Sequence, residues 1–438
     1  MNLQTIAERK AAGAALRAQT PRSSHAAWQL PPDRADPIAI LQAQGQTRIA
    51  TLLPLRTARM QASAFAFLRG SAAIMAADLA TMPSTGLCVQ AAGDCHLANF
   101  GTFRSPEGLA VFDLNDFDET LPAPFEWDVK RLATSFVLSG REAKLSAKEC
   151  RALAVTATAA YRVQIAALSG LSPLGIWAAR INLPEAIAAI DNSKLRARAQ
   201  VRLKSAMDDA TDHYGLIEAA GATWRIKMKP PTIRPVPATE IDAGALFARY
   251  ATTLPAEIRA LLDRYSLTDV AFKVVGIGSV GTYCAIALFT TADGQALILQ
   301  LKQAEQSVLA ACAGASAYDH QGERVVQGQR LLQATPDPFL GWTEGGGREF
   351  YVRQLKDQRL AAIGTDISEA LPFYAGLCGR TLARGHARSG DAAAIAGYLG
   401  AGDQMDEAIG DFAVAYADQS TADWQVIRAA VGDGRLAA

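Results

Sequence analysis

The sequence predicts an α+β fold with two lobes, on the basis of three observations. Residues 59–235 show mainly helical spacing of apolar residues around one small hairpin. Residues 269–304 contain three runs of β-branched and apolar residues, separated by a glycine-rich turn and by Asp293-Gly294, a pair that favours a hairpin. Residues 358–438 return to helical spacing. Together these patterns predict a helical lobe and a β lobe.

The same patterns divide the chain into four segments. Residues 1–58 are a turn-rich N-terminal arm, and residues 59–235 are the helical lobe. A Pro-rich passage at 229–240 marks the next boundary, because proline interrupts both helices and strand ladders. Residues 236–357 form the β lobe, and the helices of 358–438 complete the helical lobe.

Individual elements follow from local signals. In the helical lobe, helical spacing occupies 58–80, and two short strands at 86–94 and 109–116 form the small hairpin. A further helix begins near Ser146, because Ser146 and Glu149 make a capping box. The β lobe continues after its three-strand meander with one helix and two strands, at 321–333, 338–342 and 348–355.

Composition excludes several classes of protein. The 438 residues are half hydrophobic, so the chain is long enough to bury a large core. Lys plus Arg and Asp plus Glu both number 43, which argues against binding to nucleic acid or to an acidic membrane. Six cysteines without a CxxC pair predict reduced core thiols and no disulfide-linked partner. Without an apolar run of signal-peptide or membrane-spanning length, we expect a soluble, cytoplasmic protein.

The stretch GIGSVG at 276–281 fits the pattern GxGxxG. In the dinucleotide-binding form of this pattern a helix follows the loop, whereas here the next segment, TYCAIALF, is a predicted strand. A glycine-rich hairpin between antiparallel strands is the protein-kinase arrangement, in which backbone N–H groups approach the nucleotide phosphates. The predicted nucleotide-binding residues are therefore Gly276, Gly278, Ser279 and Gly281. The alternative is an ordinary hairpin.

Lys302 lies on the next predicted strand, in LILQLKQA, where a kinase-like fold places the lysine that contacts the phosphates. A lysine among apolar residues is costly without an anionic partner. Its partner would be a helix acid, with Glu323 as the first choice and Glu305 as the second. The alternative is a lysine at a strand end that reaches solvent.

The stretch GDCHLAN places Asp94 and Asn99 five residues apart, the catalytic-loop spacing of kinases. In that loop the aspartate accepts the proton of the acceptor hydroxyl and the asparagine binds Mg²⁺. His96 would brace the loop. Asp113, at the end of an apolar run in VFDLND, is the predicted second metal ligand, and Asp116 is the alternative.

Two other interpretations of these acids remain open. Four acids in a short turn often simply face water, since Asp and Asn are good turn formers. Carboxylates with one imidazole also suit a hydrolase that uses Mg²⁺ or Mn²⁺, with Asp94, His96, Asp113 and Asp116 as candidate residues. The hydrolase interpretation leaves the glycine loop and Lys302 unexplained.

Further polar residues are assigned supporting roles. Asp128, at the start of a helix in PFEWDVKRL, would hydrogen-bond the backbone of the catalytic loop or favour the helix dipole. Arg69, in an apolar context, needs an anionic partner, and a buried salt bridge with a helix acid would supply it.

Three residues of LARGHARSGD form either an acceptor site, a bracing group or a helix-end polar cluster: His386, Arg388 and Asp391. Arg353 and Lys356, in the strand FYVRQLKD, would contact phosphate or face solvent.

Several long motifs together resemble those of one family. The stretches GDCHLANFGTF, FDLNDFDETLPAPFEWDVKRLATS, VVGIGSVGT, LQLKQA and LARGHARSGD are similar to the bacterial family catalogued as domain of unknown function 2252, over roughly residues 45–420. The resemblance implies a relation to the kinase-like superfamily, including aminoglycoside phosphotransferases and choline kinases. The base, the metal-binding Asn and the metal-binding Asp of those enzymes then correspond to Asp94, Asn99 and Asp113.

The order of these motifs departs from that of ordinary kinases. In kinases the glycine loop precedes the catalytic loop, whereas here the catalytic-loop pattern begins at 94 and the glycine loop at 276. We therefore expect a protein-kinase-like two-lobed fold that is circularly permuted. The predicted function is an ATP- and Mg²⁺-dependent phosphotransferase with an unknown acceptor, for which a small molecule is favoured. A nucleotidyltransferase and a noncatalytic nucleotide-binding module on the same fold are the alternatives.

Overall fold

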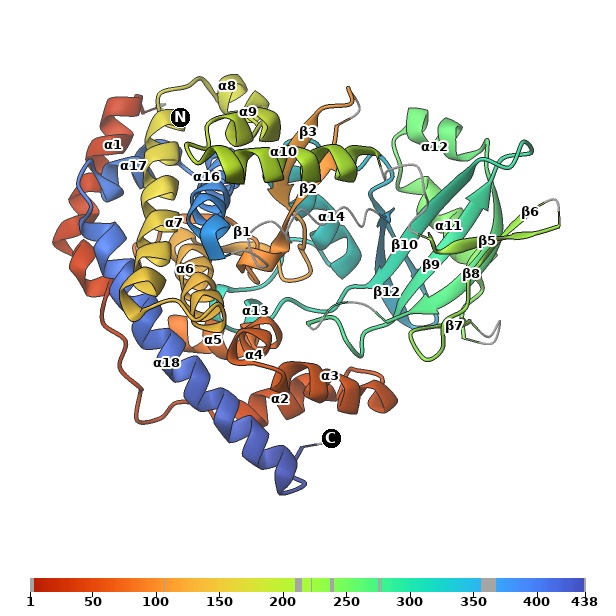
Figure 1. Ribbon diagram of the computed structural model, residues 1–438, viewed down its shortest axis with the longest axis horizontal. Coiled ribbons are helices and arrows are strands. Elements are labelled where there is room, and N and C mark those ends of the chain that lie inside the picture. The colour runs from red at the N-terminus through yellow and green to blue at the C-terminus, as the bar shows by residue number, and fades with distance from the viewer. Residues whose placement is uncertain are drawn as a thin grey trace.

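The computed structural model describes residues 4–436 except 106, 209–214, 222, 237–239, 275, 277 and 356–367. Lys356 therefore lies outside the described residues. The fold is α+β, as predicted, and Figure 1 shows a helical lobe beside a β lobe. An N-terminal arm runs along the helical lobe and contains α1 (Ile6–Ala15), α2 (Pro37–Gly45) and α3 (Leu53–Gln61).

The helical lobe is built around α6, which is buried along almost its whole length. A helix that is buried on all sides forms the centre of a core rather than its surface. The capping box of Ser146 and Glu149 begins the next helix, as predicted. The helices of this lobe are α4 (Ala64–Gly70), α5 (Ala72–Leu79), α6 (Phe125–Glu142), α7 (Ala147–Leu168), α8 (Pro173–Ala178), α9 (Leu183–Ala188), α10 (Ser193–Asp208), α16 (Leu371–Ser389), α17 (Ala392–Leu399) and α18 (Gln404–Gly432).

The lobe joins helices from both ends of the chain. Helix α16 packs against α7 so closely that a Cβ at Gly379 would lie 2.1 Å from the carbonyl oxygen of Ala157. Only glycine fits such a backbone approach. The last residue of α16, Ser389, accepts a hydrogen bond at its Oγ from the N–H of Gln90 (3.0 Å). Helix α16 therefore ends directly beside the strand that leads into Asp94.

The β lobe is a six-stranded antiparallel sheet of strand order β11-β12-β10-β9-β8-β7. The three-strand meander is confirmed as β8, β9 and β10. The Pro-rich passage, predicted as a boundary, also supplies the edge strand β7, a position that tolerates proline. The bounds are β7 (Ile233–Pro235), β8 (Ser266–Lys273), β9 (Cys284–Thr290), β10 (Ala296–Gln303), β11 (Gly341–Gly345) and β12 (Arg348–Gln354). The strand predicted at 338–342 thus begins three residues later.

In the described part of the chain, α11 (Ala243–Thr252), α12 (Ala256–Leu262) and α14 (Gln321–Leu332) accompany the sheet (Figure 1), while the short α13 (Ala310–Ala313) lies beside α5 and β4. Helix α14 was predicted from the pattern of 321–333, and it lies between the sheet and the helical lobe in Figure 1. A two-stranded sheet pairs β5 (Ile217–Ala220) with β6 (Thr223–Ile226).

The small hairpin of the helical lobe differs from the prediction. The segments at 86–94 and 109–116 do not pair with each other. Instead β1 (Cys88–Ala91) pairs with β4 (Leu121–Pro124), and β2 (Phe100–Arg104) pairs with β3 (Ala110–Leu114). The intervening segment FGTFR is itself a strand, and as the nearest neighbour in sequence it takes the pairing position beside β3.

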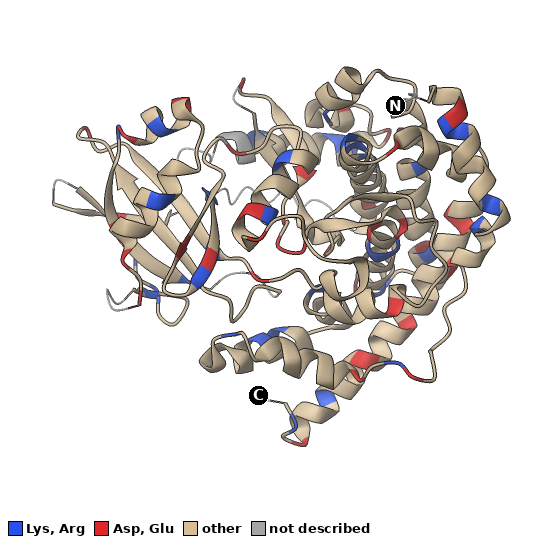
Figure 2. Cartoon of the chain, turned by 180° about the vertical axis from the view of Figure 1, so that it is seen from behind, with Lys and Arg blue, Asp and Glu red and all other residues tan. Residues whose placement is uncertain are grey.

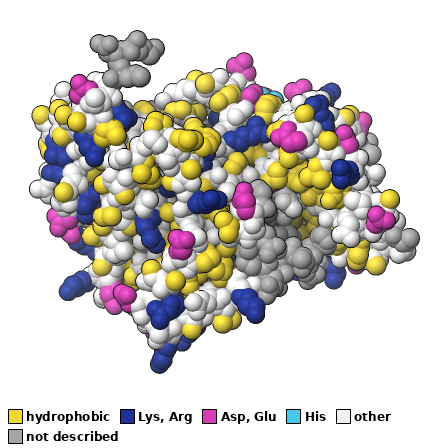
Figure 3. Space-filling model, turned by 90° about the horizontal axis from the view of Figure 1, so that it is seen from above, with side chains coloured by type: hydrophobic (Ala, Val, Ile, Leu, Met, Phe, Trp, Pro, Cys, Tyr) yellow, Lys and Arg dark blue, Asp and Glu magenta, His cyan; other side chains and the backbone are white. Residues whose placement is uncertain are grey.

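The distribution of surface charge (Figure 2) agrees with the balanced composition, whereas the burial of the cysteines agrees with the prediction only in part. Acidic and basic residues are interspersed over both lobes in Figure 2 and on the face in Figure 3. All six cysteines are free, but only four are buried, since Cys88 and Cys312 are exposed. Among the described residues, no helix is both long and apolar enough to cross a membrane.

Candidate functional site

A polar cavity of about 80 Å³ lies where the two lobes meet. Six separate segments of the chain line it, from the arm to the end of the third strand of the meander. The lining residues are Arg48, Arg69, Asp94, His96, Asn99, Asp116, Asp118, Glu119, Gly276, Gly278, Ser279, Thr282, Gln303 and Glu305. Most of the residues predicted from the two separate motifs therefore share one site.

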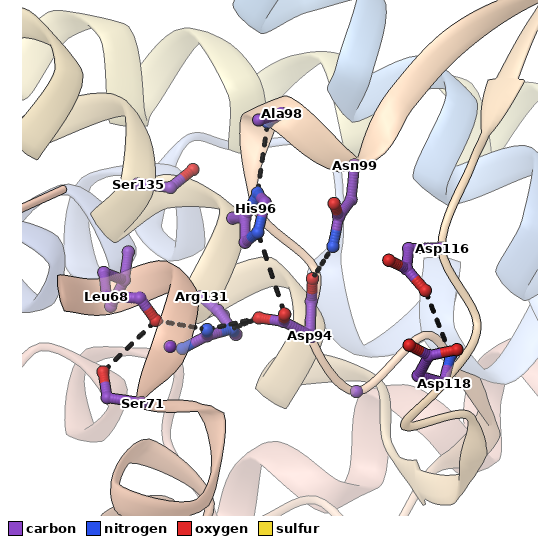
Figure 4. A network of polar contacts seen from close by, with 12 residues as sticks. Leu68, Ser71, Asp94, His96, Ala98, Asn99, Asp116, Asp118, Arg131 and Ser135 are labelled. Carbon is purple, nitrogen blue, oxygen red and sulfur yellow. Dashed lines mark hydrogen bonds and ion pairs between the residues drawn. The ribbon is translucent and has the colours of Figure 1, made fainter. Parts of the chain in front are cut away.

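The loop after β1 is held by its own backbone and by Asp128. Gly93 has a φ of +81°, and a Cβ there would lie 2.4 Å from the carbonyl oxygen of Glu119, so glycine is required. The Asp128 carboxylate accepts hydrogen bonds from the N–H groups of Ala92 (2.6 Å) and Gly93 (3.0 Å). Asn99 Nδ2 donates to the carbonyl oxygen of Asp94 (2.8 Å), as Figure 4 shows. These bonds fix the loop around the Asp94 side chain.

The two oxygens of Asp94 have different surroundings. Oδ1 accepts from Arg131 Nε (2.8 Å) and also from its Nη2. Oδ2 lies 3.7 Å from Nε2 of His96. Burial raises the pKa of Asp94, and the charge of Arg131 opposes that rise. Arg131 thus orients the carboxylate and leaves Oδ2 on the cavity side.

His96 is buried and neutral. Burial lowers its pKa well below the usual value, and the nearby charges of Arg69 and Arg131 lower it further. Nδ1 accepts a hydrogen bond from the N–H of Ala98 (3.2 Å), so the ring proton resides on Nε2, which faces Asp94. His96 therefore orders the loop without adding a charge to it.

Lys302 is a buried cation that pairs with the acidic residues of the cavity. Its Nζ donates to Asp118 Oδ2 (2.7 Å) and lies 3.7 Å from Asp116 Oδ1. Burial opposes its charge, but Asp116 and Asp118 together raise the pKa of Lys302 well above the usual value. Burial also opposes the charge of Asp118, yet Lys302 and the hydroxyl of Tyr351 (2.6 Å) bring the pKa of Asp118 down to about 2. The pair is therefore ionised.

The glycine loop covers the cavity. Gly276 and Gly281 have positive φ values of +60° and +95°, which side chains rarely adopt. A Cβ at Gly278 would lie 3.3 Å from the carbonyl oxygen of Arg69 and 3.8 Å from Asp94 Oδ2. Ser279 Oγ donates to Asp118 Oδ2 (3.0 Å). The loop of one lobe therefore rests directly on the catalytic-loop pattern of the other.

The N-terminal arm holds the glycine loop in this position. Arg48 Nη1 donates to the carbonyl oxygens of Gly278 (2.8 Å) and Val280 (2.6 Å). The N–H of Ile49 donates to the carbonyl oxygen of Gly281 (2.7 Å), and Arg59 Nη1 donates to that of Gly276. The sequence offered no signal for this contact, because a basic residue in a turn-rich arm has no distinctive pattern.

Asp113, the predicted second metal ligand, does not line the cavity. Its carboxylate is 1% exposed and pairs with Nη2 of Arg384, and it also accepts from the N–H groups of Leu114 and Ala334 (both 2.9 Å). Asp116, the alternative, does line the cavity. The reason is the strand: Asp113 is still inside β3, which is buried on both faces, whereas Asp116 follows its end.

Glu323 is likewise not the partner of Lys302, which pairs with Asp118 and Asp116 instead. Glu323 lies in the first turn of α14, where its N–H donates to His320 Nδ1 (3.2 Å). Glu305, the second choice, lines the cavity, but among the described residues it makes no ion pair with Lys302. Lys302 finds its anionic partners in the other lobe, in the turn that contains Asp116 and Asp118.

The residues of LARGHARSGD do not form one site. His386 is fully buried between the Tyr161 hydroxyl (2.9 Å) and Asp128 Oδ2 (3.2 Å), so it supports the carboxylate that holds the loop. Asp391 caps α17 and pairs with Arg9 (3.0 Å), while Arg388 stacks on Trp177 (3.8 Å).

Arg69 lines the cavity, and Arg353 contacts the segment that leads to Asp116. The guanidinium of Arg69 lies 5.9 Å from the ring centre of Phe65. Arg353 Nη1 donates to the carbonyl oxygen of Asn115 (2.8 Å), which ties the last strand of the sheet to the acidic turn.

Sequence reasoning missed Arg131, Asp118 and Glu119. Arg131 lies three residues after Asp128, so it is on the same face of α6, and this spacing was the available signal. Burial raises the pKa of Glu119 to about 7, a rise that the N–H of Val308 opposes. Among the described residues, no group of three or more His, Cys, Asp or Glu side chains is placed to hold a metal by itself.

Fold and site define an α+β protein with a carboxylate-lined cavity beneath a glycine loop. The model of a family described as "Uncharacterized protein conserved in bacteria (DUF2252)" matches residues 48–430. The chain belongs to this family, as its motifs predicted. No curated protein and no solved structure matches the chain.

Proposed function

We propose that the protein is an ATP- and Mg²⁺-dependent phosphotransferase of the kinase-like class, acting on an acceptor that the site does not yet identify. One observation carries the proposal: the glycine loop, far along the chain, meets Asp94 and Asn99 around a single cavity, and Lys302 pairs with Asp118, which lines that cavity. Two motifs that each predict kinase chemistry on their own are thereby joined in space.

The connectivity of the β lobe supports this class. The glycine loop joins β8 to β9, Lys302 lies on β10, and a helix, α14, follows before the last two strands. Protein kinases place their glycine loop, phosphate-binding lysine and following helix in this order.

A circular permutation accounts for the reversed order of the lobes. The end of α16 lies beside β1, as the bond from Gln90 to Ser389 indicates, although about 300 residues separate them along the chain. In an unpermuted chain the helix would continue into that strand at this point. Permutation keeps the same contacts and moves only the termini.

Each side chain has a role in the proposed reaction. Asp94 Oδ2 accepts the proton of the acceptor hydroxyl, while Arg131 and His96 hold the carboxylate in place. Lys302 contacts the phosphates once it is released from Asp118.

Asn99 and Asp116 would hold Mg²⁺, whose charge stabilises the transferring phosphoryl group when it is bound. Mg²⁺ is usually bound by one or two carboxylates and completes its shell with water and phosphate oxygens. Two protein ligands therefore fit this ion even without a cluster of three.

Nucleotide binding requires the glycine loop to lift. A cavity of about 80 Å³ is well below the roughly 300–1,000 Å³ of small-molecule sites. The contacts from Arg48 to the loop and from Ser279 to Asp118 keep it closed. The triphosphate would replace Asp118 as the partner of Lys302 and of the loop.

The first test measures thermal stability with and without ATP and Mg²⁺. At a hundred times its dissociation constant, a ligand stabilises the folded protein by about 2.7 kcal/mol. We expect this stabilisation in the wild type, its loss in Lys302→Met, and its retention in the control Lys227→Met, at an exposed lysine that does not line the cavity. Full stabilisation of Lys302→Met would rule out this site for the nucleotide.

Product analysis then separates the remaining functions. Phosphoryl transfer yields ADP, and nucleotidyl transfer releases pyrophosphate. Asp94→Asn should bind ATP as tightly as the wild type and yet form no ADP beyond the uncatalysed rate. A wild type that binds ATP without turnover on any acceptor would favour the noncatalytic module. A metal-dependent hydrolase would instead act without any nucleotide.

A further inference from the structure

A second cavity, of about 320 Å³, lies on the N-terminal arm and shares no residue with the first. It is a groove between α2, α3 and the end of α18, which meet at the lower edge of the molecule in Figure 1. Most of its exposed wall is apolar and comes from Leu41, Leu53, Met60, Ile427 and Leu436, while Gln42, Gln46 and Thr57 add uncharged polar groups. Its size falls within the range of small-molecule sites.

One wall of the groove contains a buried cation without an anionic partner. Arg56 is 5% exposed, and its Nη2 donates only to uncharged oxygens, those of Gln44 (3.1 Å) and Gly70 (3.0 Å). Its Nε has no hydrogen-bond partner, and among the described residues no carboxylate forms an ion pair with it. A buried charge is costly unless an opposite charge accompanies it.

The groove itself supplies Arg56 with no opposite charge. Burial lowers the pKa of Arg56 to about 9 and the nearby charge of Arg48 adds to the effect, while the charges of Glu305 and Glu119, which line the first cavity, oppose it. The groove lining includes one other charged residue, Arg435, which already pairs with Asp433 (3.3 Å). The lining contains no acid, so no carboxylate of the groove itself would compete with a bound anion for Arg56.

We propose that this groove binds a monocarboxylate with a short aliphatic chain, such as a medium-chain fatty acid. The carboxylate would pair with the guanidinium of Arg56, for which a planar two-oxygen anion is a good geometric match. The aliphatic chain would lie against Leu41, Leu53 and Met60, and its removal from water would supply further affinity. This inference does not depend on the proposed phosphotransferase activity.

The test is calorimetric titration of the whole chain with octanoate, octanol and acetate. Octanol has the tail without the charge, and acetate has the charge without the tail. We expect octanoate to bind the wild type at least tenfold more tightly than either. Equal affinity for acetate would reduce the site to a simple anion site, and no binding of octanoate would overturn the proposal.

Two variants and a control locate the ligand. Arg56→Met removes the charge at similar length and should weaken octanoate at least tenfold while leaving octanol unchanged. Gly45→Leu adds bulk to the groove while keeping Arg56, at a position where a Cβ would lie 3.6 Å from Leu53, and it should weaken both ligands. Arg259→Met, at an exposed position of α12, should change neither. If Arg56→Met fails to fold, Gly45→Leu alone decides, and octanoate binding that survives it contradicts the proposal.

Discussion

Two acidic clusters lie within a few residues of each other in the stretch FDLNDFDE, and they differ in what their carboxylates face. In the core cluster, Asp113 pairs with Arg384 and two backbone N–H groups, and all of its partners are inside the protein. In the cavity cluster, Asp116 and Asp118 share Lys302 at the edge of a cavity, with side chains 32% and 26% exposed. The carboxylate of Asp113 has all of its partners within the fold, whereas the carboxylates of Asp116 and Asp118 are still accessible to a ligand in the cavity.

The difference shows how burial divides similar residues between stability and function. A carboxylate with every partner supplied by the fold cannot also bind a metal or a substrate without breaking the fold. A carboxylate at a cavity can exchange one partner for another. The following substitutions test whether the two clusters differ in this way.

The largest effect is expected in the core cluster. Asp113→Asn leaves the fully buried Arg384 without an anionic partner, which should lower the free energy of unfolding by about 3–5 kcal/mol. The matched variant Asp116→Asn, three residues later and partly exposed, should change it by less than about 1 kcal/mol. Urea denaturation followed by circular dichroism measures both. Similar losses in the two variants would remove the distinction between the clusters.

An intermediate effect is expected from Glu119 and depends on pH. Burial raises the pKa of Glu119 to about 7, above its usual 4.5, so between these values the folded protein keeps a proton that the unfolded chain has lost. This contribution to stability is complete below pH 4.5 and is lost as the pH rises through 7.

Glu119→Gln keeps the neutral form at every pH. The stability of the variant should therefore gain on that of the wild type by about 2–3 kcal/mol between pH 5 and pH 8. Denaturation curves at several pH values measure the difference. Curves that stay parallel over this range would mean that Glu119 is ionised in the cavity.

The smallest effect is expected at the glycine loop. In Gly281→Ala the residue keeps a φ of +95°, and the new Cβ would lie 3.0 Å from Cβ of Arg48. The control Gly347→Ala has a similar φ of +71° with open space around it. Both lose stability through backbone strain, and Gly281→Ala should lose about 1 kcal/mol more. Equal losses would indicate that the arm does not hold the loop tightly.

Much of the fold could be predicted because its signals are local. The meander, α14, the capping box at Ser146 and the glycine loop each depend on residues within one short segment. The strand pairing of the small hairpin could not be predicted as reliably, because several short apolar segments compete for the same partner. The exposed Cys88 and Cys312 show the same limit, since composition does not place a side chain inside or outside.

The features of the site can likewise be separated into those that follow from local sequence and those that depend on tertiary packing. The sequence by itself determined the family, the α+β class and the residue types that gather at the cavity, since these follow from motifs and periodicity. Only the tertiary structure decided that Lys302 meets Asp118, 184 residues away, and that Asp113 meets Arg384, 271 residues away. Such pairings depend on how separate elements pack together and on which side chains that packing removes from water, and neither is encoded in the spacing of residues along the chain.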